Sequence, residues 1–377
     1  MEFYGLLLFF FQATFIVATF VQVAFWIIVY ARFVFFQDKK NEPLDAKTAL
    51  PSVSVIICAK NEEKNLLANL DLFLTQSYHS FEVLVVDDYS QDNTQKVLLE
   101  YQKKYSYLRI INNTNIKKSN GKKAALTLGI QNAKNEILIL SDADCRPASE
   151  NWIKTSVEAL CEKAVLLSYG PYFQEKGLLN AFIRYETAMT ALQYFSFALM
   201  GLPYMGVGRN LCYRKSIFEK NGGFKSHETV NSGDDDLFIN EVANGSNTAI
   251  CVDYENFNYS EPKHTWSSFV RQKTRHLTTG KHYRWYHQLL LIAWAGSHAW
   301  HYFSGLVILL IFGNATLFFW GFGLRFLVMI FLIYLTLKKL RELSLMIYLP
   351  MLDALLAIYY AVAAPISLFI AKTKQWK

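Results

Sequence analysis

Residues 136–147 read EILILSDADCRP, and the interpretation of the fold depends on this stretch. An apolar run ends in two carboxylates one residue apart, Asp142 and Asp144. The run is typical of a buried strand followed by a turn. Mg²⁺ is usually held by one or two carboxylates together with substrate phosphates. The stretch therefore predicts either a polar turn or a metal site, and the rest of the chain has to distinguish the two.

Segments of strand and helix character alternate on both sides of this stretch. Strands that alternate with helices of about 10 to 15 residues indicate βαβ units and a parallel sheet. Ligands of such sheets bind beyond the carboxyl ends of the strands, and the acidic clusters of this chain fall there. We expect an α/β domain at 51–262, after a polar linker at 37–50. The strands are expected at 52–58, 81–88, 108–113 and 136–144, and the helices at 60–76, at a stretch ending near Tyr105, and at 121–133.

The N-terminal segment, 1–36, is predicted to anchor the chain in a membrane. Of the 377 residues, 52% are hydrophobic and 18% are charged, and residues 3–31 contain no charged side chain. A helix needs about 20 apolar residues to cross the hydrocarbon core of a bilayer. By the positive-inside bias, the basic residues after this segment place the following domain in the cytoplasm; they are Arg32, Lys39, Lys40 and Lys47.

The chain after residue 262 is predicted to be helical and membrane-associated. Residues 263–297 are basic and aromatic, which suits helices that lie at a membrane surface. Residues 298–377 are expected to hold three spans, at 298–320, 322–338 and 348–371. Four spans in all would put the three C-terminal lysines outside, against the charge bias. It is therefore left open whether one segment is re-entrant or lies in the membrane plane.

Charge and cysteine content narrow the range of partners. The five cysteines contain no C-x-x-C pair, which argues against a disulfide framework and against a zinc site. The net charge is +7. In a chain with so much apolar helix, this charge suits anionic lipids and phosphate ligands, and no nucleic acid partner is expected.

Three further charged clusters lie along the chain. VVDDYSQDNT at 85–94 has two carboxylates at a strand end, which could equally be a turn that caps a helix. NSGDDDLFIN at 231–240 brings three like charges together. Such charges are costly unless a cation or a function uses them, although the first turn of a solvated helix also accepts aspartates. RQKTRHL at 271–277 has arginines that could clamp a diphosphate or bind lipid headgroups.

The order and spacing of these clusters, with the apolar helices around them, resemble the processive-type family 2 glycosyltransferases. That group includes the membrane synthases of cellulose and hyaluronan and the ceramide glucosyltransferases. The resemblance covers residues 52 to about 280. It includes CAKNEEKNL (58–66), similar to the nucleotide-binding first loop, NGKKAAL (120–126), similar to the lysine-bearing helix start, and GVGRNLCYRKSIFEKNGGF (206–224), similar to the acceptor-side segment. The resemblance implies the GT-A fold, a nucleotide-sugar-binding α/β domain with a mostly parallel sheet, flanked by transmembrane helices.

The resemblance also implies roles for particular residues. Asp144, with Asp142 beside the donor, would bind Mg²⁺ or Mn²⁺ through the diphosphate, and Gln272 and Arg275 would close over the leaving group. A departing diphosphate gains charge that a cation and basic side chains stabilise, whatever the family. The other implied donor-side residues are Glu62, Asp87 or Asp88, and Lys122, which would hold the uridine and ribose-diphosphate end. The implied acceptor-side residues are Gly208, Asn210 and His276.

The catalytic base is assigned by resemblance to the family motif Glu-Asp-x-Asp-Leu, whose second residue deprotonates the acceptor hydroxyl. Alignment on Asp236 and Leu237 makes Asp234 the base and leaves Gly233 in the place of the glutamate. A shift by one residue makes Asp235 the base, and we favour Asp234. A carboxylate base in line with the departing diphosphate gives inversion at the anomeric carbon.

Two features bear on the product. His276 stands where the processive enzymes have the tryptophan on which the acceptor sugar stacks, and the expected spans are few for a translocation channel. We therefore expect an inverting enzyme that moves one or a few sugars from a nucleotide-diphosphate donor, UDP-hexose, to a hydroxyl of a lipid or short glycan. Its catalytic domain would lie at the cytoplasmic face of a bacterial inner membrane. A processive polysaccharide synthase and an inactive sugar-nucleotide-binding membrane protein remain the alternatives.

Overall fold

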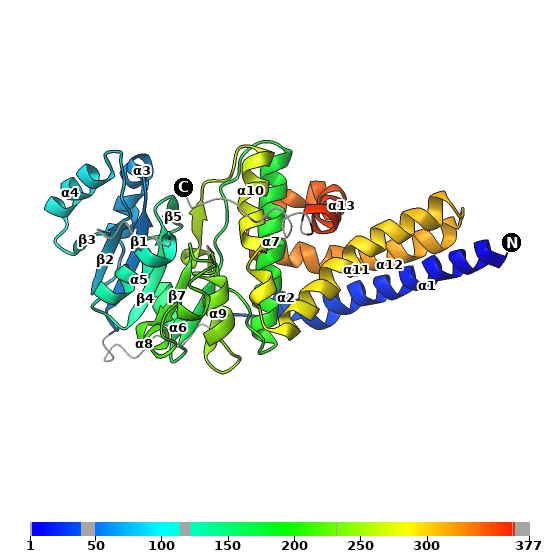
Figure 1. The fold of residues 1–377 in the computed structure, drawn as a ribbon, viewed down its shortest axis with the longest axis horizontal. Helices are drawn as coiled ribbons and strands as arrows, with labels where there is room; N and C mark the ends of the chain where they lie inside the picture. The colour runs from blue at the N-terminus through cyan, green and yellow to red at the C-terminus, as the bar shows by residue number, and fades with distance from the viewer. Residues whose placement is uncertain (1, 39–49, 114–120, 231, 364, 366–377) are drawn as a thin grey trace. The chain divides into compact units, whose positions relative to one another are not determined.

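The computed structural model describes residues 2–38, 50–113, 121–230, 232–363 and 365, and these form two compact units. The helical unit combines residues of 1–36 and 175–200 with residues of 264–372. The sheet unit combines residues of 37–174 and 201–263. Residues 175–200 therefore group with the apolar helices, although the sequence prediction includes them in the domain 51–262. Figure 1 labels most of the helices and strands of both units.

The sheet unit is built on a seven-stranded sheet in the order β3-β2-β1-β4-β7-β6-β8. The four strands expected from the sequence are present and pair in parallel, which confirms a mostly parallel sheet. β7 is antiparallel to β4 and β6, and β8 is parallel to β6. The strands are β1 Val53–Ala59, β2 Phe81–Asp87, β3 Leu108–Asn112, β4 Ile137–Asp142, β6 Val165–Ser168, β7 Leu211–Arg214 and β8 Thr248–Cys251, and a second sheet pairs β5 Cys145–Pro147 with β9 Asn258–Ser260.

Helices cover both faces of this sheet, which is why the central strands are apolar on both sides. On one face Ile57 of β1 packs in a buried cluster with Phe73 and Trp152. On the other face α5 lies so close to β1 that a Cβ at Gly129 would be 2.7 Å from Cγ2 of Ile56. The helices are α3 Glu63–Leu74, α4 Thr94–Lys104, α5 Lys122–Asn132, α6 Trp152–Leu160, α8 Lys215–Lys220 and α9 Asp236–Val242, with short 3-10 turns η3 Lys225–His227 and η4 Tyr254–Asn256.

Three helical segments among the described residues are long and apolar enough to cross a membrane: Glu2–Phe35, Ala315–Lys339 and Leu343–Val362. The sequence predicts four. The expected span at 298–320 is wrong, because one helix ends at Leu310 and the next begins at Ala315. The elements of the helical unit are α1 Glu2–Ala24, η1 Phe25–Tyr30, α2 Ala31–Phe35, α7 Leu178–Leu199, α10 Trp266–Leu277, η5 Gly280–His282, α11 Trp285–Leu310, α12 Ala315–Lys339, η6 Leu343–Tyr348, α13 Leu349–Ile358 and η7 Tyr359–Ala363.

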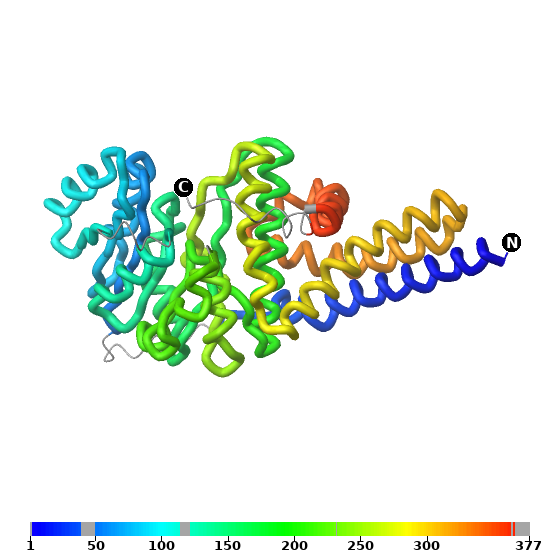
Figure 2. The backbone as a smooth tube through the Cα atoms, in the orientation of Figure 1, coloured from blue at the N-terminus to red at the C-terminus, as the bar shows by residue number. Residues whose placement is uncertain are grey.

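Polar side chains between the apolar helices are paired with one another. α1 lies alongside α11 and α12 (Figure 2). Arg325, which interrupts the apolar sequence of α12, donates from Nη1 to Oδ2 of Asp353 at 2.6 Å and from Nε to Oε1 of Gln22 at 3.3 Å. Tyr302 donates to the same Asp353 oxygen at 2.8 Å. Charged groups in apolar helices are tolerated when they are paired in this way.

Candidate active site

The carboxyl ends of three adjacent strands bring predicted acidic residues to one edge of the sheet. β1 lies between β2 and β4, and its last residues, Cys58 and Ala59, pair with Asp142 and Asp87 respectively. Parallel strands end at the same edge, which is where ligands of such sheets bind. Asp142 is the last residue of β4, and Asp144 lies in the turn between β4 and β5. The expected strand before the D-x-D sequence is therefore confirmed.

Lys122, the first residue of α5, lies between two of the acidic clusters. Its Nζ is 2.5 Å from Oδ1 of Asp142 and 3.5 Å from Oδ2 of Asp234. Burial disfavours the charged ammonium group, but Asp142, Asp234 and Asp235 outweigh this effect and hold the pKa of Lys122 well above its usual value. One positive charge thus joins the end of β4 to the aspartates before α9, which are distant in the sequence.

The D-x-D turn offers ligands to a divalent cation. One potential ligand atom each of Asp142, Asp144 and Cys145 lies within 4.8 Å of the others. Burial raises the pKa of Asp144, and the neighbouring Asp142 adds to the rise. A cation between the two carboxylates would offset this repulsion, and hard cations such as Mg²⁺ and Mn²⁺ prefer oxygen ligands. Burial and both aspartates raise the pKa of the Cys145 thiol well above its usual value, which disfavours the thiolate form at this position.

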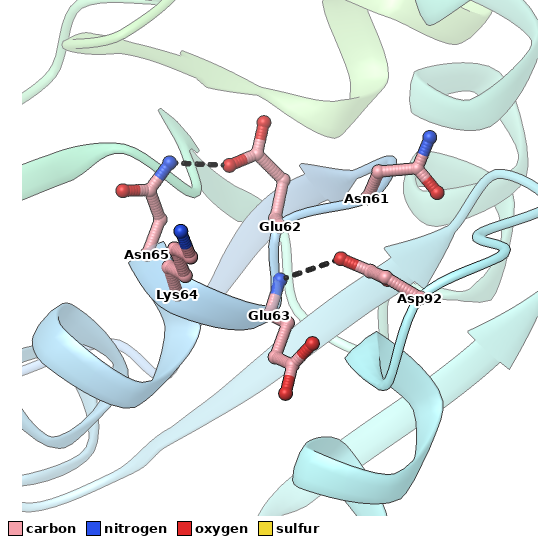
Figure 3. A pocket seen from close by; sticks show the side chains of 6 residues that line it. All are labelled: Asn61, Glu62, Glu63, Lys64, Asn65 and Asp92. Carbon is pink, nitrogen blue, oxygen red and sulfur yellow. Dashed lines mark hydrogen bonds between the residues drawn. The ribbon is translucent and has the colours of Figure 1, made fainter.

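A pocket lies at the start of α3 (Figure 3). Glu62 precedes the helix, and its Oε2 accepts a hydrogen bond of 2.5 Å from Nδ2 of Asn65. Burial raises the pKa of Glu62, and Asp144 and Asp142 add to the rise. An acidic pocket beside these carboxylates suits a ribose, because carboxylates can accept hydrogen bonds from the ribose hydroxyl groups. The pocket is lined by Asn61, Glu62, Glu63, Lys64, Asn65 and Asp92.

Asp87 and Asp88 end β2 in different surroundings. Asp88 is fully buried, and its Oδ1 accepts a hydrogen bond of 2.8 Å from Nδ2 of Asn113, which follows β3. The other oxygen of Asp88 lies 3.7 Å from Nζ of Lys60, which follows β1. Asp87 accepts a hydrogen bond of 3.1 Å from the backbone N–H of Ser90 in the turn after the strand. Asp88 therefore links the ends of three strands, and a contact of either carboxylate with a nucleotide stays a prediction.

Asp234 has the surroundings of a proton acceptor. It is buried and faces Lys122. Burial raises its pKa; Lys122 lowers it, whereas Asp235 and Asp142 raise it further. A carboxylate with a raised pKa is better suited to take up a proton near neutral pH than an ordinary aspartate. These surroundings favour Asp234 as the base, and this assignment stays a prediction.

Asp235 is held by the backbone. It is half-buried, and its two carboxylate oxygens accept hydrogen bonds from the N–H groups of Gly208 and Asp236, both at 2.8 Å. A Cβ at Gly208 would lie 3.2 Å from Oδ2 of Asp235. The close approach of these two segments therefore requires a small residue at Gly208, and it places this predicted acceptor-side glycine beside the aspartate cluster.

Gly233 occupies the position where the family motif has glutamate. Its φ is +99°, which L side chains rarely adopt. A Cβ there would lie 2.5 Å from Cδ1 of Leu237. The backbone before α9 therefore disfavours a larger side chain at this position, and glycine in place of the glutamate fits this local geometry. Asp234, which comes next, lies 3.5 Å from Nζ of Lys122, and Asp234 and Asp235 both raise the pKa of this lysine.

Asn210 lies in the interior of the sheet unit. Its side chain donates to the carbonyl oxygens of Tyr169 at 2.8 Å and Asn256 at 2.7 Å, and it accepts a hydrogen bond of 3.0 Å from Nε1 of Trp152. The residue is 1% exposed. Its side chain holds three segments together, and this argues against the predicted contact with an acceptor.

Gln272, Arg275 and His276 lie on α10, which belongs to the helical unit. Arg275 and His276 are exposed and Gln272 is half-buried. Their predicted roles beside the leaving group and the acceptor therefore stay predictions.

The sequence prediction does not single out two basic residues of the sheet unit. The guanidinium of Arg209 lies 4.4 Å from the ring centre of Tyr172, and its charge lowers the pKa of Asp144 against the effect of burial. Nζ of Lys123 donates to the carbonyl oxygen of His227 at 2.8 Å, which ties the start of α5 to the segment before the aspartates. Both residues belong to sequence motifs of the predicted site. The groups that their side chains contact are brought together only by the fold, so the sequence alone does not identify them.

Part of the sequence matches the model of a known family. Residues 54–222 match the model of glycosyl transferase family 2. Glycosyltransferase AglE of Haloferax volcanii is 31% identical over 196 residues, which are 50% of this chain and 60% of that protein. The probable glycosyltransferase YdaM of Bacillus subtilis is 27% identical over 241 residues, 60% of this chain and 54% of that protein. The dolichyl-phosphate beta-glucosyltransferase of Mus musculus is 34% identical over 128 residues, 29% of this chain and 37% of that protein.

A solved structure shows the same fold. The mannosyltransferase PcManGT from Pyrobaculum calidifontis, in complex with GDP-Man and Mn²⁺, aligns over 96% of this chain and 100% of that chain, with a TM-score of 0.62 and 17% identity. The sheet unit therefore has the GT-A fold, and residues 54–222 are similar to glycosyl transferase family 2. The chain spans only part of the length of the curated relatives, 60% of AglE and 54% of YdaM.

Proposed function

We propose that the protein is an inverting glycosyltransferase that moves a sugar from a nucleotide-diphosphate donor, UDP-hexose, to a hydroxyl of a membrane-associated lipid or short glycan. The observation that carries the proposal is the position of Lys122 between Asp142 and Asp234. The ammonium group of Lys122 links Asp142, which is proposed to lie beside the donor, to Asp234, which is proposed to act as the base. In this proposal the two halves of the transfer reaction lie next to each other.

On the donor side, the chain supplies carboxylates and cations for a sugar diphosphate. Asp142 and Asp144 would hold Mg²⁺ or Mn²⁺, which when bound stabilises the charge that grows on the diphosphate. Arg209 lies close enough to Asp144 to lower its pKa, so it adds positive charge at the same place. Glu62 would accept hydrogen bonds from the ribose in the pocket at the start of α3.

On the acceptor side, Asp234 would take the proton of the attacking hydroxyl. The oxygen of that hydroxyl forms a bond to the anomeric carbon while the bond from this carbon to the diphosphate breaks. Attack from the face opposite the leaving group inverts the anomeric configuration. The positive charge of Lys122 offsets the repulsion between the neighbouring carboxylates while Asp234 is ionised.

Relatives and apolar helices support a lipid acceptor. One relative is a dolichyl-phosphate beta-glucosyltransferase, and PcManGT binds a nucleotide sugar together with Mn²⁺. Three helical segments of this chain are long and apolar enough to span a membrane. We place the sheet unit at the cytoplasmic face of a bacterial inner membrane, because Arg32 follows the first of these segments.

The test uses the purified full chain in lipid vesicles with extracted membrane lipids, Mn²⁺ and radiolabelled UDP-sugars or GDP-sugars. We expect label in a product that organic solvent extracts, and we expect Asp144→Asn and Asp234→Asn to abolish it. Label that appears only in long polymer would favour a processive synthase. The enzyme proposal fails if no donor releases its nucleotide, or if both variants release it at the wild-type rate.

A further inference from the structure

Lys123, the second residue of α5, is buried, and its ammonium group bonds the backbone of a distant segment of the sheet unit. Its Nζ donates to the carbonyl oxygens of His227 at 2.8 Å and Val230 at 2.9 Å. The residue is 4% exposed, and burial lowers the pKa of its ammonium group. A buried charge is costly unless it is hydrogen-bonded, so these two carbonyl groups stabilise Lys123 at this position.

The two carbonyl groups belong to the two ends of one turn, residues 227–230. The N–H of Val230 donates to the carbonyl oxygen of His227 at 3.1 Å and closes this turn. The imidazole of His227 lies 3.0 Å from a carboxylate oxygen of Glu241 on α9, measured from its Nδ1. The turn is therefore tied to α9 on one side and to α5, through Lys123, on the other.

The turn 227–230 leads along the chain to Asp234, the proposed base. Val230 precedes Asp234 by four residues. The residue just before Asp234 is Gly233, and glycine gives the backbone more conformational freedom than any other residue. The residue just after it, Asp235, is held by the backbone N–H of Gly208. The position of Asp234 therefore depends on the anchors that hold the chain before and after it.

Lys122 and Lys123 are neighbours in α5 but bond different groups. Successive side chains of a helix point in directions about 100° apart. Lys122 contacts the carboxylates of Asp142 and Asp234, whereas Lys123 contacts backbone carbonyl groups. The attraction between Lys122 and Asp234 depends on their distance and does not by itself fix the direction of approach. Two directional hydrogen bonds from Lys123 supply a constraint of this kind on the preceding turn.

We propose that Lys123 is a positioning residue, whose bonds with the turn 227–230 hold Asp234 beside Lys122 and Asp142. The inference rests on the proposed function, because it takes Asp234 as the base of the transfer reaction. Lys123 acts through the backbone and touches neither the donor nor the acceptor. Loss of its bonds releases the turn before the base, while the D-x-D turn and the pocket at the start of α3 keep their own contacts. Transfer should therefore suffer more than donor binding.

The test replaces Lys123 by methionine, which has a similar length and no hydrogen-bond donor. We expect Lys123→Met to lower kcat by about 10 to 100-fold, since small misplacements of reacting groups cost rates of this order. Affinity for UDP or GDP, whichever the wild type binds with Mn²⁺, should stay near the wild-type value. Lys123→Gln keeps N–H donors on a shorter side chain and should change kcat in the same direction. It tests the proposal should the methionine variant not fold.

The matched control is Lys163→Met. Lys163 also lies in the sheet unit and donates from Nζ to a backbone carbonyl oxygen, that of Ser246, at 2.6 Å. Its loss should leave kcat at the wild-type value. Hydrogen exchange supplies a readout without substrate. The amide of Val230 should exchange about 10-fold faster or more in Lys123→Met, because the turn loses two hydrogen bonds, and at the wild-type rate in Lys163→Met.

The inference is overturned if the folded Lys123 variants keep the wild-type kcat, or if nucleotide affinity falls as much as kcat does. It is also overturned if Lys163→Met lowers kcat to the same extent, or if the exchange of the Val230 amide does not change in Lys123→Met. If the wild-type chain transfers no sugar from any donor, the proposed function fails instead. Hydrogen exchange then still decides whether Lys123 holds the turn 227–230.

Discussion

Replacing Lys122 by methionine tests whether this lysine keeps the proposed base ionised. Its Nζ lies 3.5 Å from Oδ2 of Asp234, and the two side chains are 24% and 11% exposed. At this separation the attraction of two unit charges is about 5 kcal/mol at an effective dielectric constant of about 20, and about 1 kcal/mol in water. The partly exposed pair lies between these limits, and Lys122 lowers the pKa of Asp234, so removal of Lys122 should raise that pKa further.

The expected consequence is a displaced pH profile. A base with a higher pKa stays protonated to higher pH, so the acid limb of kcat should move toward alkaline pH in Lys122→Met. The assay is sugar transfer at saturating donor and Mn²⁺ from about pH 5 to 9. Lys122→Arg retains the charge and Lys154→Met removes an exposed lysine of α6, and both should keep the limb in place. An unmoved limb in Lys122→Met would refute the proposed electrostatic role, even if kcat itself fell.

Three further predictions concern the stability of the site. Burial raises the pKa of Asp234, so ionising it in the folded protein costs stability once the pH exceeds the pKa of the unfolded state, about 4. Asp234→Asn should therefore raise Tm near pH 7 and give no gain below about pH 4. A lower Tm of this variant at pH 7 would contradict this. Gly233→Ala should cost about 1 to 3 kcal/mol of unfolding free energy because its φ is +99°, and Gly233→Glu should not increase activity; wild-type Tm in the alanine variant would show that the strain is absent. Asn210→Leu should cost about 2 to 5 kcal/mol, because Nε1 of Trp152 and two carbonyl oxygens lose their partner, while kcat per folded molecule stays unchanged; a lost kcat at unchanged Tm would restore the acceptor role.

The sequence is sufficient to predict the half of the sheet that carries the donor-side residues. Residues 83–86 and 137–140, shortly before Asp87 and Asp142, are continuously apolar, because parallel strands covered on both faces bury side chains on both sides. The grouping of residues 175–200 with the apolar helices cannot be predicted in the same way. Its helix α7 has two charged residues, Arg184 and Glu186, in an otherwise uncharged sequence, and their partners lie far along the chain. Local pattern does not reveal pairings of this kind.

The candidate site shows the same division. The residue types around Asp142, Asp144 and Asp234 are apparent in the sequence, and the D-x-D strand end is confirmed by the position of Asp142 at the end of β4. The roles of Gly233 and Asn210 depend on coordinates. A backbone dihedral explains the first, and three long-range hydrogen bonds explain the second.

Composition alone also does not predict the break between α11 and α12. Residues 298–320 contain no Asp, Glu, Lys or Arg and are expected to form one helix. Gly313, with a φ of +67°, and Asn314, whose side chain accepts from the N–H of Leu317, end one helix and begin the next. A glycine followed by asparagine is a turn signal, and here it outweighs the apolar composition on both sides.

The most direct test of the proposed active site is the Mn²⁺-dependent release of nucleotide from a nucleotide sugar by the purified chain and by its Asp144→Asn variant. We expect release by the wild type that requires the metal and an acceptor lipid, and a loss of about 100-fold or more in the variant. Lys154→Met, which changes an exposed residue, should release nucleotide at the wild-type rate. Equal rates in the wild type and Asp144→Asn, or release that does not depend on the metal, would contradict the role proposed for the D-x-D turn.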